Sequence, residues 1–253
     1  IGLVGLLLIL EAARRSLGWA LPALSSIFLV YCFAGPLLPG WLLPHRGYSL
    51  ERVVSQVFLQ SQGVFGIALR VMFTYVFLFV VFGALLELTG VTAFILDLAG
   101  RVFSRSSGAP GKIAVVASGL MGSLSGSAVA NTATTGTFTI PLMKNSGFKP
   151  SMAGGVVAAA SAGGALMPPV MGAAAYMMLE MVTPPVTYLQ IIRSALLPAL
   201  LYYFSLLLLV HLYSRRYQLA NQTLPPDSVR PVPWAGVIFS ISLGLLLVFL
   251  FVG

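Results

Sequence analysis

Oxygen-bearing side chains interrupt a long apolar stretch of the chain, residues 113–172. The chain carries no charged residue between Ile113 and Met143, and none between Pro150 and Leu179. Hydroxyl, amide and carbonyl oxygens hold hard monovalent cations such as Na+ without any fixed negative charge. The stretch therefore predicts a cation site in an apolar setting, with Na+ as the expected ion and no other cofactor.

The ligands concentrate in two places. The first is the run SGSAVANTATTG, residues 125–136, and the second surrounds Gly163–Gly164 and Pro168–Pro169. Because proline has no backbone N–H, the two prolines leave carbonyl oxygens one turn earlier without donors. Helix N-termini facing the same cavity would attract the carboxylate of an anionic substrate. We predict ion binding by Ser125, Gly126, Ser127, Asn131, Thr134, Gly163 and Gly164, and substrate binding by Thr135, Ser161 and Pro168.

Packing is the alternative interpretation of the first run. Small and hydroxyl residues in membrane helices commonly serve close contacts, and the spacing Gly122-x-x-x-Gly126 fits a helix–helix contact. The same residues match G-x-S-x-G, the nucleophile elbow of serine hydrolases, but that motif needs a preceding strand and a nearby histidine and acid. The context is helical and the histidines, His45 and His211, lie at segment ends. We therefore expect no enzyme.

Composition places these residues in a membrane protein. The chain is 58% hydrophobic and 8% charged, with a net charge of +8 and a mean hydropathy of +0.97. These values lie far outside the range of soluble domains. Lysines and arginines form short clusters between apolar runs, which indicates a positive-inside bias and no nucleic-acid partner. With the single cysteine, Cys32, no intrachain disulfide is expected.

Four apolar runs approach the roughly twenty residues that cross a bilayer: 17–38, 67–86, 188–211 and 234–252. Residues 1–10 are the expected end of a further span, so we expect the chain to be part of a longer protein, and Glu11 is placed to pair with Arg14 and Arg15. Ser49 is a predicted N-cap before an outer surface helix over 51–66, and 91–105 is a predicted cytoplasmic surface helix. Trp41 and Tyr48 are expected at the interface.

Positive charge on both sides of the first polar run bears on its topology. If both clusters are cytoplasmic, residues 113–143 form a re-entrant hairpin, since about thirty residues are short for two complete crossings. Those two crossings remain the alternative. The clusters are Arg101, Arg105 and Lys112 before the run, and Lys144 and Lys149 after it.

The predicted fold is an all-α membrane protein. We expect a multi-span helical bundle with a re-entrant helical hairpin and a broken transmembrane helix. The expected parts are 1–66, 67–112, 113–183 (hairpin 113–143, broken helix 151–183) and 184–253.

Longer runs of the chain resemble a known family. GLMGSLSGSAVANTATTGTFTIPLMKNSGFKPSMAGGVVAAASAGGALMPPVMG, HRGYSLER, FVVFGALLE and PALLYYFSLLLLVHL are similar to the fused membrane permease of tripartite ATP-independent periplasmic (TRAP) transporters, TAXI-associated type. The resemblance implies a multi-pass permease of the bacterial inner membrane, driven by Na+ or protons. It also implies a periplasmic TAXI-type binding protein as partner, and uptake of organic anions such as dicarboxylates by an elevator motion.

Two departures from the family follow from the resemblance. Where the family commonly reads V-E-A-x-A-S-T-G-G-Q, this chain has Val157, Ala162 and Ala165 in place of Glu, Thr and Gln. The family also carries a second, inverted repeat, so the resemblance implies that this chain is the first half of an inverted-repeat fold like that of ion-coupled transporters. The remaining half of the permease is then an expected partner, beside membrane lipid. Two other functions stay open: a secondary carrier that needs no binding protein, and a non-transporting membrane scaffold.

Overall fold

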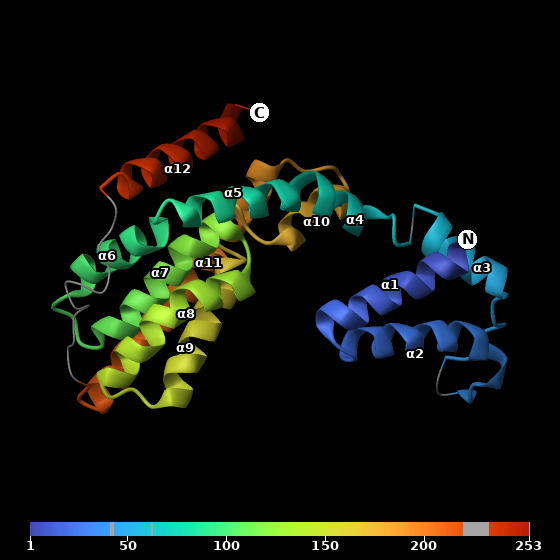
Figure 1. Ribbon diagram of the computed structural model, residues 1–253, viewed down its shortest axis with the longest axis horizontal. Helices are drawn as coiled ribbons and strands as arrows, with labels where there is room; N and C mark the ends of the chain where they lie inside the picture. The colour runs from blue at the N-terminus through green and yellow to red at the C-terminus, as the bar shows by residue number, and fades with distance from the viewer. Residues whose placement is uncertain (41–42, 62, 220–232, 253) are drawn as a thin grey trace. The chain divides into compact units, whose positions relative to one another are not determined.

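The computed structural model describes residues 1–40, 43–61, 63–219 and 233–252. Helices and turns account for the regular structure of these residues, so the all-α prediction is confirmed. The chain divides into two compact units, residues 1–72 and residues 73–253 (Figure 1). The finer four-part division stays a prediction. Trp41, expected at the membrane interface, lies outside the described residues.

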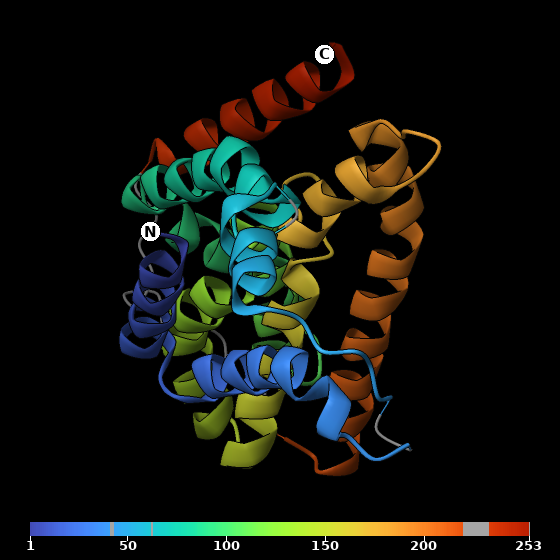
Figure 2. The ribbon, with the colours of Figure 1, turned by 90° about the vertical axis from the view of Figure 1, so that its right-hand side faces the viewer.

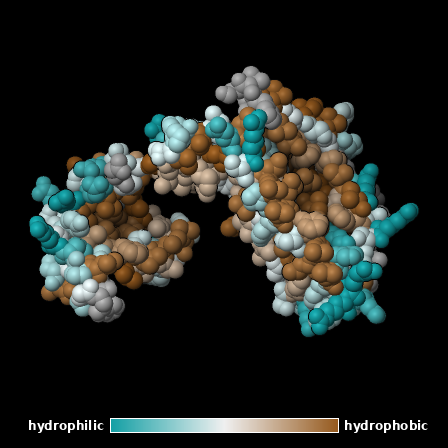
Figure 3. All heavy atoms as spheres, turned by 180° about the vertical axis from the view of Figure 1, so that it is seen from behind, coloured by the Kyte–Doolittle hydropathy of each residue, from teal (hydrophilic) through white to brown (hydrophobic). Residues whose placement is uncertain are grey.

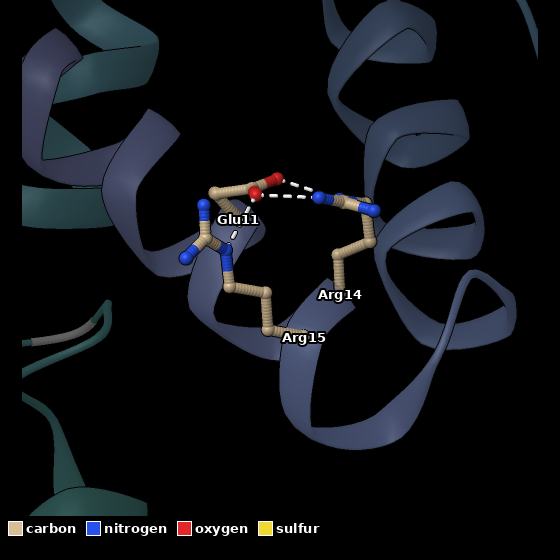
Figure 4. A network of polar contacts seen from close by, with 3 residues as sticks. All are labelled: Glu11, Arg14 and Arg15. Atoms are coloured by element: carbon tan, nitrogen blue, oxygen red, sulfur yellow. Dashed lines mark hydrogen bonds and ion pairs between the residues drawn. The ribbon is translucent and has the colours of Figure 1, made fainter.

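The first unit is built on two packed helices, α1 (Gly2–Leu17) and α2 (Ala20–Ala34), followed by the short 3-10 helix η1 (Gly35–Leu37). Beyond the apolar part of α1, Arg14 donates two hydrogen bonds of 2.6 Å to Glu11, and Arg15 donates one of 2.9 Å (Figure 4). The predicted pairing is thereby confirmed. Both guanidinium groups favour the ionised carboxylate, and they lower the pKa of Glu11 to about 2.

The surface helix after Ser49 is shorter than expected. The Ser49 hydroxyl accepts a 3.3 Å hydrogen bond from the Arg52 amide, so the predicted N-cap is confirmed for α3 (Leu50–Val54). The helix continues as a π-turn, η3 (Ser55–Leu59), and ends there because Gln60 is extended. The prediction of a helix to residue 66 was wrong on this boundary. The unit then enters α4 (Ile67–Val71).

A helix runs without a break from Ile67 to Leu88, and the second unit begins within it, at residue 73. It comprises α4, the π-turn η4 (Met72–Val76) and α5 (Phe77–Leu88). The helix α6 (Val91–Phe103) follows at the predicted position. Then come α7 (Ala109–Ser125), α8 (Ala128–Asn145), α9 (Pro150–Gly164), α10 (Ala173–Met181), α11 (Tyr188–Arg216) and α12 (Ala235–Val252).

Helix α7 is the centre of the second unit. It packs against α5, α6, α8, α9 and α11, and Figures 1 and 2 show α7, α8 and α9 side by side with the long α11 beside them. One apolar cluster joins α7 to α5, α6 and α12 through residues such as Ile95 and Met121. A second cluster joins α7 to α8, α9 and α11 through residues such as Val157 and Val210. Helix α7 is therefore packed against other helices on two sides.

Three helices are long and apolar enough to cross a membrane: Ala20–Leu37, Ile67–Leu88 and Tyr188–Arg216. They match three of the four predicted spans. The fourth, α12, has a shorter apolar part, Ala235–Val248. Large hydrophobic side chains lie exposed on all of these helices, and Figure 3 shows brown, hydrophobic residues over much of the visible face of each unit. Apolar surface of this extent is expected to contact lipid.

Candidate functional site

The hairpin of α7 and α8 turns at the predicted residues. Helix α7 ends at Ser125, and Gly126 takes the left-handed conformation with φ of 61°, its amide donating 2.8 Å to the Gly122 carbonyl. A side chain at this backbone conformation would be strained, so the turn favours glycine. Ser127 is extended and its hydroxyl caps α8 by accepting 3.3 Å from the Ala130 amide. A two-residue break, Gly126 and Ser127, thus separates the helices; we call residues 123–127 the hairpin tip.

The second discontinuity also lies where the sequence predicts it. Helix α9 ends at Gly164 and α10 begins at Ala173, with residues 165–172 between them. We call residues 165–172 the break loop. Its ends are tied together by a 2.7 Å hydrogen bond from the Gly172 amide to the Ala165 carbonyl. The Pro168–Pro169 peptide is cis, and Met171 has a φ of 41°, in the left-handed region that non-glycine residues seldom adopt.

The hairpin tip and the break loop lie against each other. The Val170 amide donates a 3.1 Å hydrogen bond to the Ser123 carbonyl, one of the last four carbonyls of α7 that have no partner within the helix. The backbone of Gly126 lies so close to the Met171 carbonyl that any side chain at Gly126 would meet that oxygen. The two regions that the sequence predicts to supply ligands are therefore neighbours in space.

Four helix ends converge at this contact. The C-termini of α7 and α9 carry partial negative charge, and the N-termini of α8 and α10 carry partial positive charge. No residue with an ionisable side chain occurs in the segments that connect these helix ends, residues 125–127 and 165–172. The chemistry available is that of helix dipoles, carbonyl oxygens and hydroxyls, which suits a monovalent cation and a carboxylate better than a tightly bound divalent metal. Among the described residues, no three His, Cys, Asp or Glu side chains gather to hold a metal ion.

Asn131 and Thr135 are buried in a polar contact between the two hairpin helices. Asn131 Nδ2 donates 2.7 Å to the Ser118 carbonyl, and Thr135 Oγ1 lies 3.0 Å from Ser118 Oγ. Both side chains are at most 1% exposed. Sequence reasoning missed Ser118, because one serine in an apolar run carries no pattern of its own. The amide of Asn131 thus connects α8 to α7, whether or not its oxygen also binds an ion.

Glycine packing explains part of the same region. Gly122 of α7 and Gly164 of α9 meet backbone to backbone, and a Cβ on Gly164 would lie 2.8 Å from both Gly122 Cα and Asn131 Nδ2. The packing alternative therefore holds for Gly122. Gly126, the other glycine of that spacing, instead makes the turn.

Ser161 is the one buried side chain of the described residues whose polar atom has no hydrogen-bond partner. Its side chain is 0% exposed, and it lies on α9 one turn before Gly164, on the same helix face. A buried hydroxyl without a partner costs about 1–3 kcal/mol. The Ser161 hydroxyl thus makes no hydrogen bond in this structure, and its role in substrate binding stays a prediction.

The remaining predicted residues lie in different surroundings. Thr134 is half-buried and its hydroxyl donates 3.0 Å to the Ala130 carbonyl of its own helix. Gly163 is buried against the ring of Tyr202, and Pro168 is half-buried in the break loop. At the first departure from the family pattern, Val157 is fully buried in the apolar cluster of α7, α8, α9 and α11. These positions do not change the site assignment, which stays a prediction.

Two tyrosines that sequence reasoning missed bond to carbonyls of the break loop. Tyr188 Oη, at the start of α11, donates to the Pro169 carbonyl at 2.8 Å and lies 3.3 Å from the Val170 carbonyl oxygen. Tyr176 Oη, on α10, donates 2.9 Å to the same Val170 carbonyl. No motif could have found them, since a tyrosine near the end of an apolar run is typical of an interface anchor.

Comparison with known proteins gives one match. The family model described as "Tripartite ATP-independent periplasmic transporter, DctM component" matches residues 4–252. No curated protein and no solved structure matches the chain.

Proposed function

The chain belongs to the DctM-component family of TRAP transporters, and from this premise we propose that it couples an inward Na+ gradient to the uptake of organic anions such as dicarboxylates. Membership itself makes the chain a non-enzymatic membrane permease component of a binding-protein-dependent secondary transporter in a bacterial membrane. The coupling ion, the substrate class and a TAXI-type binding protein belong to the proposal.

The contact between the hairpin tip and the break loop carries the proposal. The Val170–Ser123 hydrogen bond brings two backbone discontinuities together, and the Met171 carbonyl faces Gly126 beside them. Irregular backbone at membrane depth is tolerated where it is buried in protein or lines a cavity, and broken helices in transporters commonly form the ion and substrate sites. This supports the assignment of Ser125, Gly126 and Ser127 to the coupling ion.

We assign the substrate to the part of this contact where two helices have their N-termini. Helices α8 and α10 both begin there, and the positive ends of helix dipoles favour a carboxylate. Ser161 supports this assignment, because its buried hydroxyl lacks a partner. The proposed substrate is thus an organic anion that accepts hydrogen bonds from hydroxyls and helix N-termini.

A re-entrant hairpin and an elevator motion complete the proposal. Helices α7 and α8 are joined by a two-residue break, and the segments on both sides carry lysine or arginine. A hairpin that enters and leaves on one side satisfies the positive-inside rule on both flanks. We expect a second, inverted repeat to supply the other face of the site.

Uptake into proteoliposomes tests the proposed function. The permease is reconstituted with its binding protein, and uptake of a labelled organic-acid panel is measured with and without an inward Na+ gradient. We expect uptake to require both. The variant Ser125→Ala removes a hydroxyl whose weak contact is a 3.4 Å hydrogen bond from the Ser127 amide, so it should raise the half-saturating Na+ concentration with little loss of stability.

A matched control uses an exposed serine of α11. Ser205→Ala removes a hydroxyl that donates 2.7 Å to the carbonyl of Tyr202 in its own helix, and should leave Na+ dependence unchanged. Uptake without the binding protein would favour another type of secondary carrier. Folded protein that binds its partner but transports nothing under any gradient would favour the scaffold alternative.

A further inference from the structure

The break loop is held on two sides through a single peptide unit. The peptide between Pro169 and Val170 contributes one carbonyl oxygen and one amide N–H. The carbonyl accepts the 2.8 Å hydrogen bond from Tyr188, and the N–H donates the 3.1 Å hydrogen bond to Ser123. In a planar trans peptide the C=O and N–H vectors point in opposite directions. The hydroxyl of Tyr188 and the carbonyl of Ser123 therefore fix the two ends of one rigid group.

The side chain of Tyr188 is itself fixed. Its ring stacks on Tyr176 with centroids 4.9 Å apart and an interplanar angle of 10°. Tyr176 stacks in turn on Tyr75 at 5.5 Å and on Phe79 at 5.4 Å. Thr187 and Gln190 form a capping box that holds the first turn of α11, where Tyr188 is the first residue.

Both hydroxyls also lie beside the next carbonyl of the break loop, that of Val170. Tyr176 and Tyr188 both lie within hydrogen-bond distance of the Val170 carbonyl oxygen, at 2.9 and 3.3 Å. That oxygen is therefore occupied, whereas the following carbonyl, of Met171, faces the hairpin tip at Gly126. The tyrosines thus bind the carbonyls of Pro169 and Val170, and the carbonyl of Met171 is the one that lies against the tip.

We propose that Tyr188 and Tyr176 are positioning residues of the transport site: by orienting the Pro169–Val170 and Val170–Met171 peptides, they set the carbonyl geometry on which ion affinity depends. Neither tyrosine is a ligand in this proposal. The inference rests on the proposed ion site between the hairpin tip and the break loop. It adds residues that lie outside both ligand-rich runs and act through the backbone.

The chain supplies matched controls for this role. Tyr202 and Tyr203 donate hydrogen bonds of 2.8 Å from α11 to the carbonyls of Ala159 and Ala160. These bonds match the bond of Tyr188 in donor group, length and parent helix. Their acceptors, however, belong to the regular part of α9. Tyr202→Phe and Tyr203→Phe thus report the effect of losing one such bond away from the break loop.

The test measures two quantities in Tyr188→Phe, Tyr176→Phe and the two controls. The first is uptake in proteoliposomes with the binding protein, resolved into the half-saturating Na+ concentration and the maximal rate. Phenylalanine keeps the stacked ring and removes only the hydroxyl. We expect the half-saturating Na+ concentration to rise roughly two- to tenfold, the equilibrium equivalent of one hydrogen bond, in Tyr188→Phe and Tyr176→Phe but not in the controls.

The second quantity is the hydrogen-exchange rate of the Val170 amide in nanodiscs, which needs no transport. Loss of the Tyr188 hydroxyl should speed exchange at Val170, while Tyr202→Phe should leave it unchanged. The inference is overturned if the Val170 amide of Tyr188→Phe exchanges at the same rate as in the controls. It is also overturned if the half-saturating Na+ concentration of Tyr188→Phe equals that of the controls. Wild-type uptake with no Na+ dependence would instead refute the proposed coupling ion, and the Val170 exchange rate would still decide the inference.

Discussion

The amide of Val170 donates a hydrogen bond to the carbonyl of Ser123, so the break loop satisfies the C-terminal end of α7. A helix end buried in protein requires such a partner, because its last carbonyls have none within the helix. The bond thus explains why helix α7 can stop inside the bundle. It also explains why the hairpin and the broken segment are found together.

The contact between Gly122 and Gly164 predicts the effect of Gly164→Ala. The added Cβ would lie 2.8 Å from Gly122 Cα, a backbone atom that cannot rotate away. Forcing the helices apart should lower the free energy of unfolding by about 1–3 kcal/mol. Thermal unfolding in detergent measures this.

Gly154→Ala is the control within the same helix, since nothing lies within 4 Å of the added Cβ. It should leave stability unchanged or raise it by up to about 1 kcal/mol, because alanine is the better helix former. Equal melting temperatures for the two variants would contradict the close contact between α7 and α9.

Asn131→Ala should destabilise the hairpin. The substitution removes the 2.7 Å hydrogen bond from Asn131 Nδ2 to the Ser118 carbonyl in a site that water does not reach. The expected loss is about 1–3 kcal/mol of unfolding free energy, read from chemical denaturation. Thr134→Ala is the comparison, because the Thr134 hydroxyl bonds only within α8 and the side chain is half-buried.

The two variants separate structure from ion binding. If Thr134 is an ion ligand, Thr134→Ala should weaken Na+ dependence while its unfolding curve matches wild type. An unchanged Na+ dependence would remove Thr134 from the site. A wild-type unfolding curve for Asn131→Ala would show that its amide contributes little to the contact between α7 and α8.

Ser161→Ala should affect transport without loss of stability. Its buried hydroxyl has no partner, so its removal should leave the free energy of unfolding unchanged or raise it by about 1 kcal/mol. If the hydroxyl contacts substrate, the half-saturating substrate concentration should rise roughly two- to tenfold in proteoliposome uptake. Ser146→Ala, which removes a buried 3.0 Å bond to the Leu142 carbonyl, should lower stability and spare substrate affinity.

The pH dependence of stability should reveal the Glu11 network. Arg14 and Arg15 lower the pKa of Glu11 from 4.5 to about 2 in the folded protein. Because the folded-state pKa is the lower one, this contribution is fully present above pH 4.5 and is lost as the pH falls toward 2. The carboxylate is exposed to solvent, so the effect should be small and sensitive to salt.

Glu11→Gln isolates that contribution. The difference in melting temperature between wild type and Glu11→Gln should shrink as the pH falls below 4.5, while Glu180→Gln, which has no ion pair among the described residues, serves as the control. A difference that stays constant across this range would mean that the arginines do not stabilise the Glu11 carboxylate.

Local chemistry made part of this structure predictable. The hairpin turn at Gly126 and the end of α9 at Gly164 follow from glycine, serine and proline in an uncharged run, and the Ser49 cap follows from residue type. The early end of the surface helix at Leu59 was missed, since the sequence through Gly66 keeps its amphipathic character. Local propensity does not encode where a π-turn will stop a helix.

Contacts distant in sequence were not predictable in the same way. The Ser118 hydroxyl of α7 pairs with Thr135 of α8, and Tyr188 of α11 bonds to Pro169 of the break loop; neither Ser118 nor Tyr188 belongs to a recognisable pattern. In the bonds from Asn131 to Ser118 and from Tyr188 to Pro169 the acceptor is a backbone carbonyl, which every residue carries, so residue types give no hint of the pairing. The sequence thus indicated where the two helix breaks lie, whereas the residues bonded to them from other parts of the chain required the three-dimensional structure.

The Pro169–Val170 peptide also constrains how the parts of the second unit can move. It is bonded at one end to the hairpin and at the other to the first turn of α11. If the hairpin travels while α11 stays still, one of these two bonds must break and re-form in every transport cycle, which adds a barrier to the turnover rate. If both bonds persist, the first turn of α11 moves together with the hairpin. The boundary between the moving and the stationary parts then lies farther along α11.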